Sequence, residues 1–383
     1  MNCIKKILKP FKYILLYIFY ICKAEKNIKK INTFLKDAEK NILFITHNLG
    51  GGTRQYEKNY ILNNNNNVLV LRIISYGYDL VYSLENNKTG KQIFIKKNYL
   101  KYLINFSFSK IIVNSLVTSF NYDSFLSFCK NYKAKFDTEI IYLIHDYHCI
   151  CPRINLLANN VFCNLDCKNN NCKFSIFVEN TNNSIDKWRK NWSSFMGITD
   201  TIYCFSESSK KLINRTYPEL NQNKIIVKPH DMGYCSFKPI KIKEKLPLNI
   251  AIVGACFSIP KGKLVIQSLF KNVSKEVSFS MIGVSKKQLK TERSNVIFYG
   301  KYEHSDLPQI LEKSGASCVV FPSVWPETFS YLVSELILLD VPIICFNLGA
   351  QAEKVKTYSK GIVCEDVNDM INLINSKSKY YGK

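Results

Sequence analysis

Short apolar runs alternate with amphipathic stretches along most of the chain. In the first half, runs of strand length cover residues 41–46, 68–74, 110–114, 139–144, 201–205 and 224–227, with a small hairpin predicted at 81–84 and 92–95. In the second half they recur at 249–253, 278–282, 295–299, 318–321 and 342–346. Helical patterns lie between these runs, and strands that alternate with helices are typical of parallel sheets. The pattern therefore predicts an α/β protein.

A Lys- and Pro-rich stretch, residues 238–248, separates the two series of strands and is interpreted as a linker. At 383 residues the chain is long enough for two domains of about 150–200 residues. We therefore expect an N-terminal domain at 41–237 and a C-terminal domain at 249–365. Residues 1–40 precede them, and a tail at 366–383 is expected to cross back to the first domain.

The stretch from residue 318 to residue 350 carries the clearest chemistry. An apolar strand leads into a Pro-rich loop, a helix is predicted from Thr328 to about Leu339, and a second strand ends near Gly349. Glu327 and Glu335 stand eight residues apart, about 12 Å along a helix. Two acids so placed can bind two separated hydroxyl-bearing groups of one elongated ligand.

Between these two acids, the free N–H groups near Phe329, Ser330 and Tyr331 are expected to form a helix N-terminus, which favours a phosphate. A nucleoside diphosphate-sugar has this layout, because its negatively charged diphosphate lies between the hydroxyls of the sugar and those of the ribose. The spacing of the two acids alone is weak evidence for a ligand site. An ordinary helix with one acid at its N-terminus and a second Glu on its surface has the same spacing.

The residues around the two acids make the match specific. The sequence PSVWPETFSYLVSE, followed by Pro342 and by Asn347-Leu348-Gly349-Ala350, closely resembles the donor-site motif of retaining family 4 glycosyltransferases with the GT-B fold. It is most similar to the bacterial branch that builds surface polysaccharides. The resemblance implies two Rossmann-like domains facing across a cleft, with Glu327 on the donor sugar, Glu335 on the ribose, and Thr328, Phe329 and Ser330 beside the donor.

The start of the C-terminal domain is expected to bind the diphosphate. The strand at 249–253 is followed by Lys261-Gly262 and by a helix from about Lys263. A lysine there brings a point charge to a diphosphate, and the family motif requires one. The family's usual Arg, a few residues earlier, is replaced by Cys256 and Phe257, so neutralisation is expected to depend on Lys261 and on helix amides.

In the N-terminal domain, a strand, Gly50-Gly51-Gly52 and a helix from Thr53 follow one another, an arrangement in which backbone approaches a phosphate closely. A glycine turn after any buried strand is the simpler interpretation. The resembled family has a similar loop, which implies that Gly51 and Gly52 line the site. It also implies a donor-sugar contact for His145, which falls at a strand end, with Asp146 as a group that orients its ring.

Five cysteines fall within residues 149–172, an expected insertion in the N-terminal domain. A structural zinc site is predicted at Cys151, Cys163, Cys167 and Cys172. The alternatives are thiols in an acceptor-side loop or a reversible disulfide. No catalytic metal or other cofactor is expected, because no suitably placed Asp-x-Asp pair is present.

The chain carries a net charge of +23, from 53 basic and 30 acidic residues, which suits a polyanionic partner. No zinc-finger, RNA-binding or helix-turn-helix signature is present, which disfavours nucleic acid. Apolar residues recur at helical spacing among lysines in the first 20 residues, and the continuous apolar run, 13–22, is too short to span a bilayer. An amphipathic helix on an anionic membrane surface is favoured over a secretory signal. The expected location is the cytoplasmic face of the cell membrane.

These observations together predict a metal-independent glycosyltransferase. It would transfer a sugar from a nucleoside diphosphate-sugar to a lipid-linked glycan or another cell-surface acceptor, with retention at the anomeric carbon. His145, Lys261 and Glu327 are the expected catalytic residues. Two alternatives stay open: a GT-B nucleotide-sugar epimerase, and a non-catalytic basic membrane-surface protein with a degenerate transferase fold.

Overall fold

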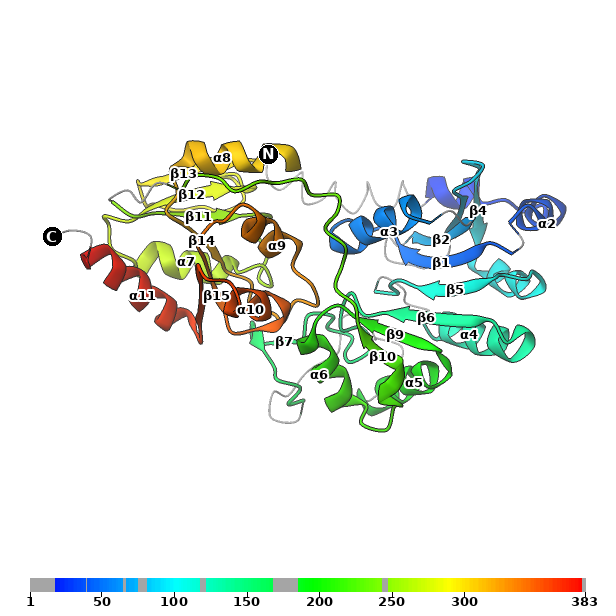
Figure 1. Ribbon diagram of the computed structural model, residues 1–383. Coiled ribbons are helices and arrows are strands. Elements are labelled where there is room, and N and C mark those ends of the chain that lie inside the picture. The colour runs from blue at the N-terminus through cyan, green and yellow to red at the C-terminus, as the bar shows by residue number, and fades with distance from the viewer. Residues whose placement is uncertain are drawn as a thin grey trace. The chain divides into compact units, whose positions relative to one another are not determined.

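The computed structural model describes residues 18–38, 40–64, 67–74, 81–117, 122–167, 185–242 and 247–380. The chain divides into two compact units. The first comprises Met1–Ile154, Lys173–Phe205 and Lys210–Lys228, and the second comprises Asn155–Cys172, Ser206–Ser209 and Pro229–Lys383. Each unit is built on its own largely parallel sheet, as the alternating pattern predicts (Figure 1).

The first unit contains an eight-stranded sheet in the order β10-β9-β6-β5-β1-β2-β3-β4. Its strands are β1 (Ile42–His47), β2 (Val68–Ile74), β3 (Val81–Asn86), β4 (Gln92–Lys96), β5 (Lys110–Val113), β6 (Glu139–Leu143), β9 (Thr201–Cys204) and β10 (Ile225–Val227). All pairs are parallel except β2–β3 and β3–β4, and β3 and β4 form the predicted hairpin at the sheet edge. Both β1 and β2 are buried along their whole length, as expected for central strands covered on both faces.

The helices that connect these strands are α2 (Ile28–Lys36), α3 (Gly52–Leu62), α4 (Tyr122–Phe136), α5 (Ile185–Ile198) and α6 (Glu207–Thr216), with 3₁₀ turns at Lys97–Asn105 and Gln222–Lys224. Because β1, β5 and β6 are adjacent and parallel, the loops that follow them lie at one edge of the sheet. The predicted glycine loop and His145 are both at this edge.

The second unit contains a six-stranded, fully parallel sheet in the order β13-β12-β11-β14-β15-β16. Its strands are β11 (Asn249–Val253), β12 (Ser278–Ile282), β13 (Val296–Gly300), β14 (Cys318–Phe321), β15 (Ile343–Phe346) and β16 (Gly361–Cys364). Its helices are α7 (Lys263–Asn272), α8 (Leu307–Ser314), α9 (Tyr331–Leu338), α10 (Gly349–Lys356) and α11 (Val367–Tyr380), with a 3₁₀ turn at His304–Asp306. A small hairpin, β7 (Leu157–Ala158) and β8 (Val161–Phe162), also belongs to this unit.

Alternate residues of the second sheet face two helical layers. One buried cluster joins strand residues such as Ile250 and Ile252 to α7 and α11, and the other joins Ala251 and Val253 to α8, α9 and α10. Figure 1 shows α7 and α11 on one face and α8 and α9 on the other. The segment expected to be a tail is therefore helical, and α11 places Met370 in the core of this unit.

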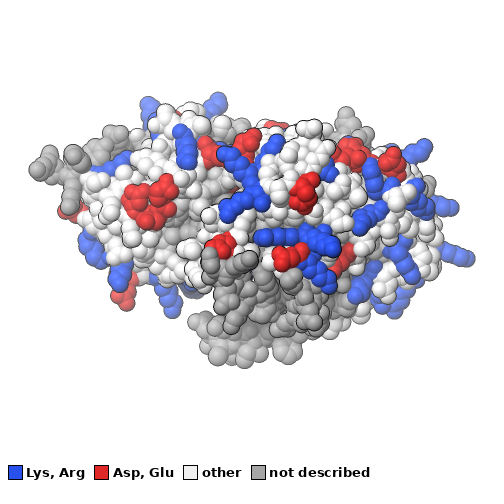
Figure 2. Space-filling model, turned by 90° about the horizontal axis from the view of Figure 1, so that it is seen from below, with Lys and Arg blue, Asp and Glu red and all other residues white. Residues whose placement is uncertain are grey.

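The predicted membrane-associating segment, residues 1–40, is described from residue 18 onward except at residue 39, and its helix α2 buries Ile31, Phe34 and Leu35. Residues 18–23 are helical, and residues 1–17 are not described. Among the helices that are described, none combines the length and the apolar character needed to cross a bilayer. Figure 2 shows basic side chains spread over one face of the molecule with acidic side chains among them, so the positive charge on that face is not gathered into one patch.

Candidate functional site

Lys261 and Glu327, which are 66 residues apart, meet at the edge of the second sheet where its strands end. The Lys261 ammonium lies 2.6 Å from a Glu327 carboxylate oxygen, and the Ser323 hydroxyl donates to the same oxygen at 3.1 Å. The Glu327 side chain is 5% exposed, whereas that of Lys261 is 44% exposed. The carboxylate is therefore fixed by its neighbours, and the ammonium remains accessible to a ligand.

Two glycines permit the close backbone contacts behind this pair. Gly262 has φ +89°, and a Cβ on it would lie 2.2 Å from the Pro322 carbonyl oxygen. Gly349 has φ +59°, and a Cβ there would lie 2.5 Å from the Glu327 backbone nitrogen. Any side chain at either position would push the loop after β14 away. The glycines thus set where Glu327 stands.

Helix α9 begins three residues later than predicted, which corrects the geometry inferred for the two acids. Ser330 is its N-cap, and the Ser330 hydroxyl accepts from the Val333 N–H. Thr328 and Phe329 therefore belong to the loop, and the first turn of the helix begins at Tyr331. Because Glu327 is outside the helix, the distance of about 12 Å expected for eight helical residues does not apply.

Glu335, in the second turn of α9, is held by two residues that the sequence did not indicate. The Tyr234 hydroxyl donates to its Oε1 at 2.8 Å, and His304 Nε2 lies 3.0 Å from the same atom. The His304 ring stacks on Phe237 at 4.7 Å. Glu335 is 7% exposed, so its carboxylate is fixed in one orientation beside an aromatic surface.

The family's missing Arg is not replaced by a cation at the same place. Cys256 is buried, its thiol donates to the Val253 carbonyl oxygen at 3.3 Å, and burial raises its pKa to about 12. Cys256 therefore stays a neutral thiol, and Phe257 is an exposed apolar side chain. This supports the expectation that Lys261 and helix amides carry the positive potential.

Lys354, on α10, is a further basic residue next to this loop. Its ammonium donates to the Ser330 carbonyl oxygen at 3.3 Å and to the Ser334 hydroxyl, and it lies 3.3 Å from the centroid of the Phe329 ring. Sequence reasoning missed it, because AEKVK is typical of a charged surface helix. Its position four residues after the matched Leu348-Gly349-Ala350 was the available signal.

In the first unit, His145 follows β6 and is packed between two rings. The imidazole stacks on Phe205 at 4.5 Å and meets Tyr56 of α3 edge-on at 4.8 Å. His145 is 8% exposed. The helix that follows the glycine loop therefore contacts the histidine that follows β6, two strands away from β1 in the sheet.

Asp146 holds the loop that carries His145. Its carboxylate accepts from the Ser115 hydroxyl at 2.9 Å and from the His148 backbone N–H at 2.8 Å. Burial raises the pKa of Asp146 to about 6, although both hydrogen bonds favour the charged form. The structure thus ties the Asp146 carboxylate to the loops after β5 and β6, a role different from the predicted orientation of the His145 ring.

The glycine loop follows directly from β1. A Cβ added at Gly50 or Gly51 would meet no atom within 4 Å, and Gly51 has φ +84°. His47 Nδ1 accepts the Leu49 N–H at 3.1 Å, which requires that nitrogen to be unprotonated. Burial lowers the pKa of His47 to about 4, so this turn persists at neutral pH. The loop is fixed at its start and has open space beside its backbone.

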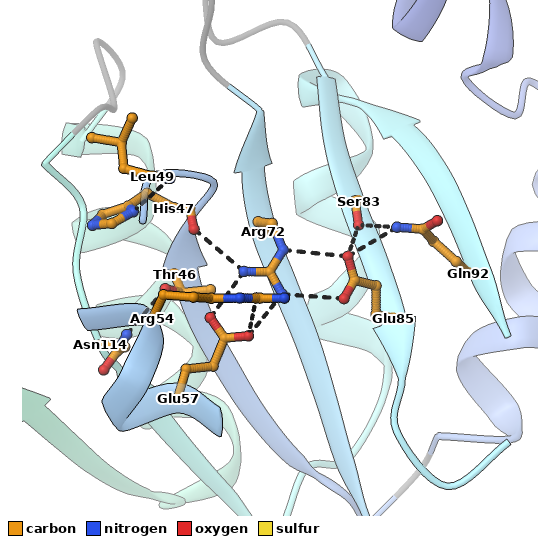
Figure 3. Close-up of polar contacts among 10 residues, drawn as sticks. All are labelled: Thr46, His47, Leu49, Arg54, Glu57, Arg72, Ser83, Glu85, Gln92 and Asn114. Carbon is orange, nitrogen blue, oxygen red and sulfur yellow. Dashed lines mark hydrogen bonds and ion pairs between the residues drawn. The ribbon is translucent and has the colours of Figure 1, made fainter. Parts of the chain in front are cut away.

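A buried ion network lies behind this loop. Arg72 of β2 bonds both carboxylate oxygens of Glu57 at 2.9 and 2.8 Å, and Glu85 at 3.3 and 3.1 Å. It also donates to the His47 carbonyl oxygen at 3.3 Å, and Arg54 pairs with Glu57 (Figure 3). Burial lowers the pKa of Arg72, but its bonds to the two carboxylates outweigh this and raise it. Arg72 thus joins α3, β3 and the end of β1.

The predicted zinc ligands are described only in part. Cys151, Cys163 and Cys167 are in the described residues, and Cys172 is not. Among the described His, Cys, Asp and Glu side chains, no three are close enough to hold a metal ion. The four-thiolate site remains a prediction.

Comparison with known proteins gives a family match for the C-terminal region. Residues 228–376 match the family model for group 1 glycosyl transferases. The C-terminal region is a group 1 glycosyl transferase domain. A 41.2 kDa uncharacterized protein from the cps region of Klebsiella pneumoniae is 28% identical over 144 residues, which are 36% of this chain and 39% of that protein, so the match spans well under two thirds of the relative.

The solved structures extend the likeness to the whole chain. HepE of Anabaena in complex with UDP matches with a TM-score of 0.57 and 12% identity over 89% of this chain and 90% of that one. A glycosyltransferase from Rickettsia africae matches with a TM-score of 0.56 and 14% identity, over 90% of this chain and 89% of that one. The lipopolysaccharide outer core galactosyltransferase WaaB matches with a TM-score of 0.53 and 13% identity, over 90% of this chain and 91% of that one. At these identities the likeness shows the fold, and the predicted GT-B fold with two Rossmann-like domains is confirmed.

Proposed function

We propose that the protein is a retaining glycosyltransferase that uses a nucleoside diphosphate-sugar and needs no metal ion. The observation that carries this proposal is the pair formed by Lys261 and Glu327 within the group 1 domain. An accessible ammonium and a fixed carboxylate, 2.6 Å apart, present a cation and a hydroxyl acceptor side by side. In a nucleoside diphosphate-sugar the sugar hydroxyls and the diphosphate are also adjacent, so the carboxylate suits the sugar and the ammonium suits the diphosphate.

Each group has a chemical task in this proposal. The bond between the anomeric carbon and the diphosphate breaks with its electron pair leaving on the diphosphate oxygen. Lys261 and the N-terminal end of the α9 dipole stabilise that developing charge. Glu327 accepts hydrogen bonds from sugar hydroxyls. The acceptor hydroxyl forms the new bond to the anomeric carbon and gives its proton to the departing diphosphate oxygen.

The other predicted site residues are assigned to the remaining parts of the donor. Glu335, oriented by Tyr234 and His304, is assigned to the ribose hydroxyls, because a buried carboxylate with a fixed orientation suits a vicinal diol. In the first unit, His145 is assigned to the donor sugar, and Gly51 and Gly52 are assigned to close backbone approach. The HepE complexes, one with UDP and one with UDP-glucose, support a nucleotide donor for this fold.

For the acceptor we propose a lipid-linked or cell-surface glycan, reached at the cytoplasmic face of the membrane. Support comes from the cps-region relative, from the lipopolysaccharide galactosyltransferase among the solved structures, and from the net charge of +23. The lysine-rich N-terminal segment is the proposed membrane contact.

A panel of UDP-, GDP- and ADP-sugars tests the proposal. The purified protein should bind one class of donor and slowly release its nucleoside diphosphate, and release should accelerate when membrane lipid extract is added as acceptor. NMR of the product should show the donor's anomeric configuration. A nucleotide-sugar with an inverted ring carbon would indicate an epimerase. No binding of any donor would favour a non-catalytic surface protein.

A further inference from the structure

Lys354 is a basic residue whose position is hard to explain by packing alone. Its ammonium contacts the Ser330 carbonyl oxygen, the Ser334 hydroxyl and the face of the Phe329 ring. None of the described carboxylates lies within ion-pair distance of it. Placing an amine in such surroundings costs folding free energy, and a methionine would fill the same space without that cost.

The charge state of this amine changes near neutral pH. Burial lowers the pKa of Lys354 to about 7, although the charges of Glu327 and Glu353 oppose the shift. His230, which stacks on Phe329 at 4.4 Å, stays neutral, because burial and the charge of Lys354 lower its pKa to about 3. The groups that face Lys354 are therefore one acid on its own helix, one acid on the loop, and a neutral imidazole.

Two of the three contacts, Phe329 and Ser330, fall on the segment that joins Glu327 to α9, and the third, Ser334, lies in the first turn of α9. Phe329 and Ser330 lie between the proposed sugar-binding acid and the N-terminus of α9. A cation on this segment fixes its backbone and adds positive potential beside Glu327, whose own charge is balanced by Lys261. With both lysines charged, they balance the charges of Glu327 and Glu353, whereas with Lys354 neutral the same groups carry a net negative charge that opposes an anionic ligand.

We propose that Lys354 is a positioning residue of the donor site: it fixes the Phe329–Ser330 segment and supplies a cation that strengthens diphosphate binding. This rests on the proposed function, since it concerns the same site. It predicts a pH dependence of a definite sign. The amine is charged below neutral pH, so its contribution to diphosphate affinity, measured as the ratio of wild type to a variant without the amine, should be about five- to tenfold larger at pH 6 than at pH 8.5.

The test is isothermal titration of the full chain with UDP, GDP and ADP from pH 6 to 8.5. Lys354→Met should weaken binding about tenfold at pH 6 and leave it near wild type at pH 8.5, because the wild-type amine is then neutral. Lys354→Gln should behave in the same way and serves if methionine disturbs the packing. Titration of the phosphate itself cancels in the ratio of variant to wild type. Lys360→Met, an exposed lysine paired with Asp340, should keep the wild-type profile.

The outcomes separate this proposal from the function on which it rests. If the nucleotide binds and the Met and Gln variants keep the wild-type pH profile, Lys354 does not supply charge to the site, and the glycosyltransferase proposal stands. A loss of affinity that is equal at every pH would indicate packing alone and would also overturn the role. If no nucleoside diphosphate binds to the wild type, both proposals are wrong.

Discussion

Replacing Arg72 with methionine tests the buried ion network behind the glycine loop. Arg72 is 7% exposed and Glu57 is 1% exposed, and two hydrogen bonds join them. The substitution removes the cation and leaves the Glu57 carboxylate buried. It also removes the partner that lowers the pKa of Glu85 against the opposing effect of burial.

The magnitude follows from what remains around Glu57. Removing one partner of a buried ion pair costs about 3–5 kcal/mol, because the other charge is left uncompensated. Arg54, whose side chain is 38% exposed, still pairs with Glu57, so we expect the lower end, about 3 kcal/mol. The double variant Arg72→Met/Glu57→Leu buries no charge at this point and should recover most of the loss.

Tryptophan fluorescence during urea unfolding measures this loss in the first unit. Trp188 and Trp192 belong to that unit and Trp325 to the other, so a Trp325→Phe background restricts the signal to the first. Lys110→Met is the control, because Lys110 forms a partly exposed pair with Glu139 at 2.8 Å and should lose less than about 1 kcal/mol. If Arg72→Met loses no more than the control, the network does not stabilise the unit.

Three further predictions concern other parts of the chain. Gly349→Ala should lower turnover about tenfold or more, because the added Cβ would displace Glu327. The control Gly315→Ala, at φ +64° with open space around it, should lower only the stability, by the backbone strain of about 1 kcal/mol, and equal activity in the two variants would contradict this reasoning. Lys354 binds fewer protons in the folded than in the unfolded state between pH 7 and about 10.5, so stability should rise with pH across that window in wild type and not in Lys354→Met; parallel melting curves would refute it. Deleting residues 1–17, which spares Ile31 and the rest of α2 in the core, should reduce sedimentation with anionic vesicles while preserving nucleotide binding, and undiminished sedimentation would be the opposite result.

Most of the fold could be predicted from local pattern. The strands β2, β11, β12 and β14 begin and end where their apolar runs do, because buried parallel strands need continuous apolar residues. Because the strands were expected to be parallel, His145 could also be placed at the sheet edge where strands end, but the order of the strands could not be predicted. Helix α9 was misplaced because the side chain of Ser330 caps it, which the helical pattern starting at Thr328 concealed.

The partners of the site residues could not be predicted from the sequence. Tyr234 reaches Glu335 across 101 residues, and His304 reaches it across 31. Lys354 resembles any surface lysine until α10 is packed beside the loop that carries Phe329. Such contacts depend on tertiary packing, which neither periodicity nor short motifs encode.

The central claim is that Lys261 and Glu327 act on the reacting sugar and the departing diphosphate. The most direct measurement is single-turnover kinetics, with the donor that the panel identifies, on folded Lys261→Ala, Glu327→Ala and Glu335→Ala. The first two should lose about a hundredfold or more in rate, as when one group that stabilises developing charge is removed. Glu335→Ala should chiefly weaken donor binding, by about 1.5–3 kcal/mol. A wild-type rate for Glu327→Ala would contradict the assignment of the site and, with it, the proposed function.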